Sequence, residues 1–487
     1  MPTALDNAAP AAIPAHLLPA LAASGLKALT LAGRRLLPIV QGGMGVGVSA
    51  HRLAGAVAAQ GGVGTLSSVD LRRHHPDLME RTSGLSQRAG CDEDSKAQIN
   101  AANLEALERE VHAARAASGG RGLIAMNVMR AVSDYANYVK RSLEAGIDMV
   151  VVGAGLPLDL PDLAQDHPKA LLVPILSDSR GVALIVKKWE RKKRLPDAIV
   201  IEHPRLAGGH LGAARIADLN DPRFEFDRVL PESLDFLRKA GLEGQIPLIA
   251  AGGIRTCEDI ARIQNLGGAA AQLGTPFAVT TEGDASDEFK RVLAEARDED
   301  MIEFTSVAGL PARAVGTPWL KAYLKAEPKL QLVAHAKERC TKAFDCLAQC
   351  GLRDGLQGWG QFCIDNQLAA AMRGDLKKGL YFRGMGALPF GTQIRSVREL
   401  MERLLSRGFP LPQPAAAADA PVLAIDGLDI RLPAGADRAL AVQGASLQLR
   451  AGQTLCVVGE SGSGKSMIAN AIMGLLPGPQ VSPVAGR

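Results

Sequence analysis

The chain has 487 residues, of which 47% are hydrophobic and 52 are glycine, and its formal net charge is only +4. A charge this small for the length gives no basis for binding nucleic acid or a membrane surface. The N-terminus lacks the basic start and apolar run of a signal peptide, and no window is apolar enough for a membrane span. We therefore expect a cytoplasmic protein of two or three domains, without direct membrane insertion.

A short apolar run that ends in glycine or a small polar residue, followed by an amphipathic helix, recurs from about residue 37. Helical patterns such as 51–60, 134–145 and 257–266 separate runs that are nearly continuous in apolar residues, as buried parallel strands are. The predicted strands are 37–44, 62–69, 122–129, 149–155, 171–178, 198–203, 247–254 and 270–277. Eight such units predict an α/β fold, the (β/α)₈ or TIM barrel, with an open doubly wound sheet as the main alternative.

The pattern divides the chain into five parts. They are an N-terminal extension, a barrel, a mostly helical C-terminal extension, a linker rich in proline and alanine, and a second unit, at 1–36, 37–282, 283–408, 409–421 and 422–487. Residues 70–121 interrupt the barrel pattern after the second strand and become helical near 102–117. Long insertions that follow a barrel strand lie on the catalytic face, so we expect this one to cover the site.

The last two predicted barrel strands end in residues suited to binding a phosphate. These residues are Gly252 and Gly253 after the seventh strand, and Gln272, Leu273, Gly274 and Thr275 at the end of the eighth. Glycines let backbone N–H groups approach a phosphate closely, and this place is the recurrent phosphate site of TIM barrels. The alternative is that the glycines only make tight turns.

The sixth predicted strand leads into Glu202 and, through Gly208 and Gly209, to His210. Two glycines at a strand end expose the imidazole at the mouth of the barrel. Such a group can take a proton from a weak carbon acid near neutral pH. A purely structural role for His210 is the alternative.

These motifs, in this order, resemble the nitronate monooxygenase family, also called 2-nitropropane dioxygenase-like, which includes flavin-dependent enoyl-acyl-carrier-protein reductases. The resemblance covers 37–408. The matching segments are 38–44 (PIVQGGM), Asn127 within AMNVM, 207–212 (AGGHLG), 250–254 (AAGGI) and 272–277 (QLGTPF).

The resemblance implies that FMN is bound at the strand ends. Its ring would lie against Gly43, Met44 and Asn127, and Gly208 would approach it closely. Its phosphate would be held by Gly252, Gly253, Gln272, Leu273, Gly274 and Thr275, and we place Glu202 among the cofactor-binding residues. His210 matches the family's catalytic base, which abstracts the α-proton of a nitroalkane or positions its nitronate.

The implied function is an FMN-dependent nitronate monooxygenase that oxidises alkyl nitronates with O₂ to a carbonyl compound and nitrite. One position departs from the pattern, because Leu206 stands where many members have an acidic residue. An NAD(P)H-dependent flavin reductase of enoyl thioesters or quinones is therefore the alternative. A third possibility, of another class, is the ATP-binding component of an ABC transporter.

Four of the seven cysteines, Cys340, Cys346, Cys350 and Cys363, cluster with the spacing C-x5-C-x3-C-x12-C. Four thiolates can hold zinc or an iron–sulfur cluster, but this spacing matches none of the standard ligand patterns. We therefore predict buried structural thiols and no metal, with a cluster as the alternative.

Residues 459–466 form a G-x-x-x-x-G-K-S phosphate loop between a predicted apolar strand at 454–458 and a helical pattern at 467–473. The predicted nucleotide-binding residues are Gly459, Ser461, Gly462, Ser463, Gly464, Lys465 and Ser466, with ATP and Mg²⁺ as ligands. Residues 422–487 resemble the opening of an ABC-transporter ATPase of the peptide-importer type. The printed sequence ends before that family's Walker B carboxylate, so we expect a fusion or truncation remnant.

Overall fold

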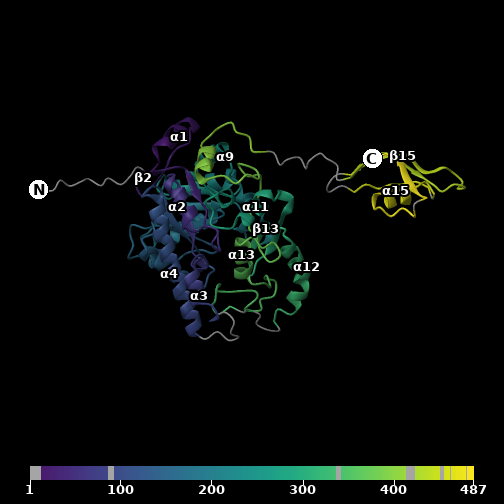
Figure 1. Ribbon diagram of the computed structural model, residues 1–487. Helices are drawn as coiled ribbons and strands as arrows, with labels where there is room; N and C mark the ends of the chain where they lie inside the picture. The colour runs from purple at the N-terminus through teal and green to yellow at the C-terminus, as the bar shows by residue number, and fades with distance from the viewer. Residues whose placement is uncertain are drawn as a thin grey trace. The chain divides into compact units, whose positions relative to one another are not determined.

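A computed structural model describes residues 12–85, 93–335, 340, 342–412, 423–449, 454–460, 462–478 and 480–486. The chain forms two compact units, Met1–Pro412 and Gln413–Arg487 (Figure 1). None of the described helices is long and apolar enough to cross a membrane.

The first unit is built on a closed barrel of eight parallel strands, which confirms the predicted fold class. In order around the barrel these are β3 (Ile39–Gln41), β4 (Val63–Ser67), β5 (Leu123–Met129), β6 (Met149–Gly153), β7 (Leu171–Leu176), β8 (Ile199–Glu202), β10 (Leu248–Ala251) and β11 (Ala270–Leu273). Pairing of β11 with β3 closes the barrel and excludes the open sheet. Each predicted strand contains one of the observed strands.

The inside of the barrel is filled by apolar side chains, and a short hairpin covers one of its ends. The hairpin consists of β1 (Leu29–Leu31) and β2 (Arg34–Leu36). Its Leu29, Leu31 and Leu36 pack in one cluster with inward-facing strand residues such as Val40 and Val200. Since β2 leads directly into the start of β3, the hairpin covers the amino ends of the strands and leaves the carboxyl ends open.

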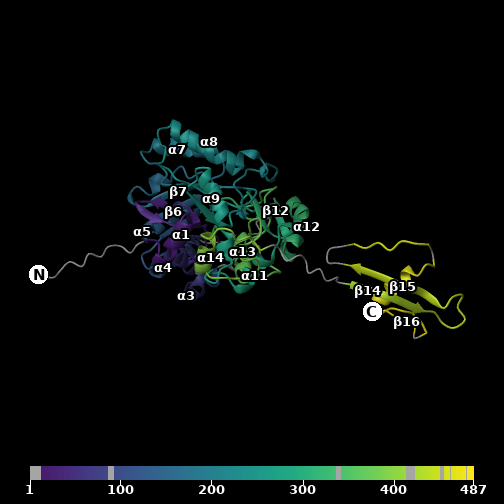
Figure 2. The same cartoon turned by 90° about the horizontal axis from the view of Figure 1, so that it is seen from above.

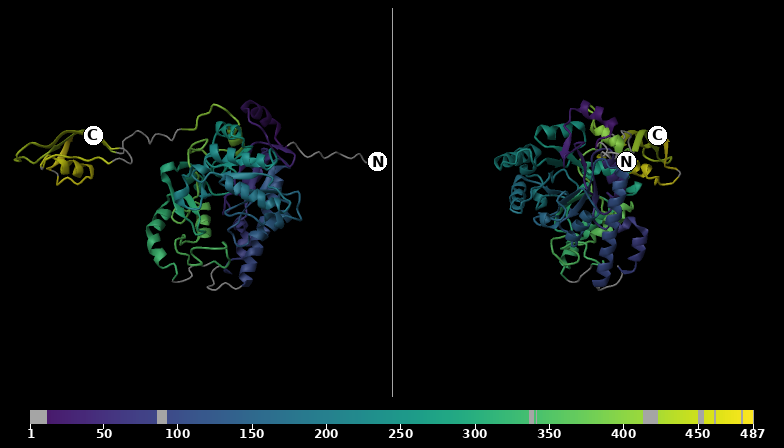
Figure 3. Two further views of the ribbon diagram at one scale, coloured as in Figure 1. Left: turned by 180° about the vertical axis from the view of Figure 1, so that it is seen from behind. Right: turned by 90° about the vertical axis from the view of Figure 1, so that its left-hand side faces the viewer.

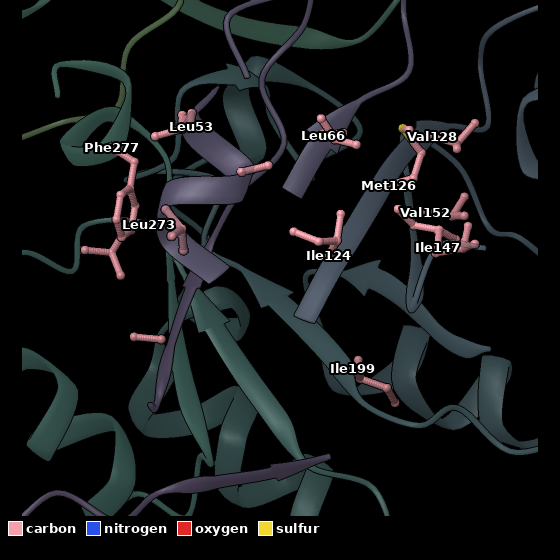
Figure 4. Packing of buried hydrophobic residues seen from close by; sticks show 14 of the residues in the cluster. Leu53, Leu66, Ile124, Met126, Val128, Ile147, Val152, Ile199, Leu273 and Phe277 are labelled. Carbon is pink, nitrogen blue, oxygen red and sulfur yellow. The ribbon is translucent and has the colours of Figure 1, made fainter. Parts of the chain in front are cut away.

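Helices surround the barrel in a second layer (Figures 2 and 3). The main ones are α2 (His51–Ala59), α4 (Glu93–Ser118), α5 (Tyr135–Glu144), α7 (Ser179–Glu190), α8 (Phe226–Lys239) and α9 (Cys257–Asn265). Figure 4 shows the apolar layer between helices and strands, with Leu53 of α2 and Ile124 of β5 among its members. Small residues let the helix layer lie close to the strands. At Gly64 of β4, for example, a Cβ atom would lie only 1.8 Å from the carbonyl oxygen of Ala54 of α2.

The long insertion after β4 forms η2 (Leu71–His74), α3 (Pro76–Arg81) and α4, a helix of 26 residues. The expected helix near 102–117 is therefore confirmed but begins earlier, at Glu93. A buried carboxylate ties the insertion to the barrel layer. Glu110 lies 2.8 Å from Nδ1 of His51 on α2 and 3.0 Å from Nε2 of His75.

The expectation that 283–408 is mostly helical is wrong in part. The segment contains α11 (Asp287–Glu295), α12 (Pro318–Leu332), α13 (Ile364–Met372) and α14 (Val397–Leu404), but also β12 (Met301–Thr305) and β13 (Pro311–Val315). Strand β13 pairs with β12 and with the short strand β9 (Gly209–His210). Its Ala312, Arg313 and Ala314 favour helices intrinsically, and burial of the whole strand overrides that weak preference.

The second unit contains an antiparallel sheet of β15 (Leu440–Leu449), β14 (Leu423–Arg431) and β16 (Ser482–Ala485), and the helix α15 (Lys465–Ile472). The strand expected at 454–458 does not form. Its apolar side chains are exposed, Val458 by 87%. A central strand needs partners on both edges for its backbone groups, and the described sheet pairs only the other three strands.

We expect Leu36→Ala to lower the free energy of unfolding by about 2–5 kcal/mol, because it opens a cavity where the hairpin meets the barrel interior. Leu36 is fully buried. Urea unfolding measures the change, and Thr30→Ala, at the exposed centre of β1, is the control. Equal effects of the two substitutions would contradict the packing described for the hairpin.

Candidate active site

A cavity of about 670 Å³ lies at the carboxyl ends of the barrel strands. It brings together every residue predicted for the barrel site. These are Gly43, Met44, Asn127, Glu202, Gly208, His210, Gly252, Gly253, Gln272, Leu273, Gly274 and Thr275. Parallel closure explains the convergence, because it places the ends of β3, β5, β8, β10 and β11 at one rim.

The rim at β10 and β11 offers backbone N–H groups. Gly252 and Gly253 have φ angles of +106° and +72°, which only glycine adopts without strain. None of the described residues accepts a hydrogen bond from the N–H of Gly253 or Gly274. This rim can therefore donate hydrogen bonds to an anion without breaking bonds within the barrel.

The side of the cavity at β3 and β5 is packed more tightly. A Cβ atom at Gly43 would lie 2.3 Å from Cβ of Asn127, so only glycine fits beside that side chain. Gln41 replaces part of the β3–β4 ladder, with its amide bonded to the backbone N–H and carbonyl of Thr65. These contacts fix the segment that presents Gly43 and Met44 to the cavity.

Two arginines and a loop that sequence reasoning missed also line the cavity. Arg383 is buried and donates to the carbonyls of Leu293 and Gly384. The N–H of Gly384 donates to the hydroxyl of Thr275 at 3.1 Å. This hydroxyl thus holds the loop, which leaves the backbone of Thr275 for the predicted phosphate contact.

Arg255 follows the β10 glycines and donates to the carbonyl of Gly253 at 3.0 Å. Its position directly after the Gly-Gly pair was a signal available in the sequence.

His210 lies on β9, which pairs with β13 through Ala312. Its half-buried ring packs 5.6 Å from the ring of Phe382, and Nε2 has no partner among the described residues. Burial lowers the pKa of His210 to about 4. At neutral pH the imidazole is therefore uncharged and able to accept a proton.

Glu202 ends β8 inside the same cavity, where burial raises its pKa to about 7. Near neutral pH this carboxyl group can therefore either donate or accept a proton. The neighbouring His203 is different: its side chain is fully buried, packs edge-on against Phe226 and lies 3.3 Å from Glu225. His203 thus has a structural place outside the cavity.

In the second unit, α15 begins directly after Gly464, as the phosphate-loop motif predicts. The loop curls around Lys465, whose amine donates to the carbonyls of Gly459 at 2.7 Å and Glu460 at 2.6 Å. Gly462, Ser463 and Ser466 belong to the same loop and helix start. Ser461 lies outside the described residues.

The cysteines of the predicted cluster lie between α12 and α13, with Cys346 in the wall of the cavity. All four are free thiols, as are Cys257 and Cys456, whereas Cys91 lies outside the described residues. No three His, Cys, Asp or Glu side chains within the described ranges converge closely enough to hold a single metal ion.

Comparison with known families decides what the barrel unit is. The family model for nitronate monooxygenase matches residues 33–407. The chain belongs to the nitronate monooxygenase family. Membership assigns the barrel unit to the flavin-dependent oxidoreductases. Residues 442–482 separately match the model of the ABC transporter family.

Individual relatives are distant. The chain is 25% identical over 288 residues to a probable nitronate monooxygenase of Bacillus subtilis, covering 58% of this chain and 78% of that protein. A second, from Staphylococcus saprophyticus, is 26% identical over 176 residues, which span 36% of this chain and only 45% of the relative. A peptidoglycan transport ATP-binding protein of Agrobacterium fabrum is 40% identical over 67 residues, which span 14% of this chain and 12% of the relative.

Two solved structures share the barrel fold. A nitroalkane oxidase from Streptomyces ansochromogenes has a TM-score of 0.51 at 20% identity, covering 75% of this chain and 94% of that one. FabK from Thermotoga maritima has a TM-score of 0.50 at 18% identity, covering 76% and 91%. At this identity the likeness concerns the fold alone.

We expect Glu202→Gln to be more stable relative to the wild type at pH 8 than at pH 4.5, both in the flavin-free protein. Glu202 has a raised pKa, so its contribution is complete below its unfolded pKa and is lost as pH rises through about 7. The difference in free energy of unfolding between the variant and the wild type should shift by about 2–3 kcal/mol in favour of the variant between pH 4.5 and pH 8. Urea unfolding at both pH values measures this.

Glu190→Gln is the control, because Glu190 is an exposed residue at the end of α7. A pH-independent effect of Glu202→Gln would contradict the raised pKa.

Proposed function

We propose that the barrel unit binds FMN and oxidises alkyl nitronates with O₂ to a carbonyl compound and nitrite, with His210 as the base that accepts the α-proton of a nitroalkane. The observation that carries the proposal is the cavity itself. It joins an uncharged imidazole to a rim of free backbone N–H donors. A carbon acid and a phosphate-bearing cofactor need these two features side by side.

The cavity residues fit FMN. The N–H groups of Gly253 and Gly274 would hold its phosphate, and Arg255, directly after the β10 glycines, would add a positive charge nearby. Gly43, Met44 and Asn127 would face its ring. When bound, FMN supplies the redox chemistry, and the protein supplies binding and orientation.

His210 acts through its environment. Packing against Phe382 and pairing of β9 with β13 fix the ring, so Nε2 points at a defined place. Partial burial of the ring lowers its pKa and keeps the imidazole neutral before the substrate binds. After it accepts the α-proton, the imidazolium is paired with the anionic nitronate, which offsets the desolvation of both charges.

Anaerobic mixing separates the proposed reaction from the reductase alternative. The nitronate monooxygenase proposal predicts that the flavin absorbance bleaches when a nitronate is added and persists when NADPH is added. Rapid bleaching by NADPH alone would instead assign the site to NAD(P)H-dependent reduction of enoyl thioesters or quinones.

For the second unit we infer binding of a nucleotide phosphate by 459–466. Support comes from α15 starting at Lys465 and from the match of 442–482 to the ABC transporter family. ATP with Mg²⁺ is the proposed ligand. Lys465→Ala should abolish binding of a fluorescent ATP analogue, and unchanged binding would contradict the proposal.

We expect Gly253→Ala to weaken FMN binding by about 10- to 100-fold, because an alanine changes the backbone that presents the N–H to the phosphate. Gly267→Ala is a matched control: Gly267 has φ +91°, and a Cβ there would lie 2.4 Å from Cδ1 of Leu234. At Gly253 the φ is +72° and the corresponding distance, to Leu206, is 2.7 Å. Both variants carry backbone strain, and only Gly253 lines the cavity. Fluorescence titration measures affinity. Equal losses in both variants would argue against the phosphate rim.

We expect His210→Asn to retain FMN and to reduce turnover of neutral nitroalkanes by about 10²- to 10⁴-fold. Preformed nitronates have already lost the proton and should be affected less. Oxygen consumption with both substrates measures the difference, and His112→Asn, at an exposed position of α4, is the control. Equal losses with the two substrates would exclude a role as base.

A further inference from the structure

The described residues 340 and 342–366, which we call the cysteine segment, extend into the first turn of α13 and carry four thiols, of which that of Cys346 lines the cavity. The thiol of Cys346 interacts electrostatically with those of Cys340, Cys350 and Cys363. Cys346 and Cys363 also pack against the main apolar core, which includes Cys350. The fold therefore brings side chains from both ends of the segment to one place.

Polar contacts hold the cysteine segment in shape. Lys342 forms an ion pair with the buried Asp365, which joins the start of the segment to its end. Arg353 donates to the carbonyls of Leu347 at 2.6 Å and Ala348 at 3.0 Å. The side chain of Arg353 thus stabilises the turn between Cys346 and Cys350.

The turn is also anchored to the rest of the unit. The N–H of Gly351 donates to the carbonyl of Val307 at 2.7 Å, and the N–H of Ala348 donates to that of Ala131 at 2.9 Å. A segment tied at these points presents its sulfur atoms at fixed positions, as a preformed ligand set requires.

Backbone N–H groups point at two of the sulfur atoms. The sulfur of Cys350 accepts from the N–H groups of Leu352 and Arg353, and that of Cys363 accepts from Asn366. Such donors stabilise an anionic sulfur.

The arrangement does not suit a single ion. Thiolates that share one zinc ion all lie about 2.3 Å from it, and no such convergence exists among the described residues. An iron–sulfur cluster instead places its cysteine ligands on separate iron atoms, so the four sulfur atoms stand further apart. The four thiols are free, and that of Cys346 interacts with the other three, so the four side chains lie in one neighbourhood.

We propose that Cys340, Cys346, Cys350 and Cys363 bind a cluster of four iron and four sulfide ions. Each thiol loses its proton to solvent and forms one bond to iron, so a cluster core of charge +2 becomes a bound complex of charge −2. Because Cys346 and Asp365 line the cavity wall, the cluster lies next to the proposed flavin site. The proposal does not depend on the proposed function.

Iron and acid-labile sulfide content test the proposal on the full chain. The protein is purified anaerobically and reconstituted with ferric iron, sulfide and dithiothreitol. We expect about four iron and four sulfide ions per chain, and an electron paramagnetic resonance signal after dithionite reduction that a flavin does not produce. Cys350→Ser and Cys363→Ser should lose most of this iron, whereas Cys257→Ser, in the buried start of α9, should keep it.

The wild-type measurement stands by itself if a variant fails to fold, which circular dichroism reveals. Wild-type protein that carries neither iron nor sulfide after reconstitution overturns the proposal. One zinc ion per chain that resists exchange also overturns it, as does a disulfide between two of the four cysteines in the anaerobic protein. Equal iron loss in Cys257→Ser would show that the iron is bound elsewhere or adventitiously.

Discussion

Parallel pairing of eight strands, closed by β11 against β3, leaves the first unit with two unlike ends. The hairpin β1–β2 fills the amino end with Leu29, Leu31 and Leu36. At the carboxyl end the loops diverge, so the cavity forms there. Every residue proposed to bind the cofactor or move a proton depends on this closure, because these residues come from strands far apart in the sequence.

The same desolvation acts in opposite directions on the two titratable groups of the cavity. It lowers the pKa of His210 to about 4 and raises that of Glu202 to about 7. Both groups are thereby shifted toward their uncharged forms. A cavity whose titratable groups are neutral accepts a neutral nitroalkane at little electrostatic cost. Thus the chemistry proposed for His210 follows from the burial that the barrel imposes.

Much of the barrel could be predicted from the sequence. Continuous apolar runs predict the buried strands, and the glycines at their ends predict which residues form the rim of the cavity. Prediction failed where tertiary contacts decide the structure. Strand β13 reads as helix-forming in its Ala312–Ala314 core and becomes a strand only by pairing with β9 and β12. The apolar run at 454–458 reads as a strand, yet it pairs with no other strand in the described part of the second unit.

In the candidate site, too, some residues could be predicted from the sequence and others could not. Glycines and His210 could be found locally, because they sit at strand ends. Arg383 could not, since it reaches the cavity from a loop more than a hundred residues beyond β11 and bonds only to backbone carbonyls there. The bond from Gly384 to the hydroxyl of Thr275 is equally invisible without the fold.

The molecule held between the glycine rim and the imidazole can be identified by releasing it from the purified protein. We expect a yellow protein from which heat or acid releases a flavin whose mass is that of FMN, one per chain. A protein that carries no flavin and takes up none when incubated with excess FMN would contradict this expectation.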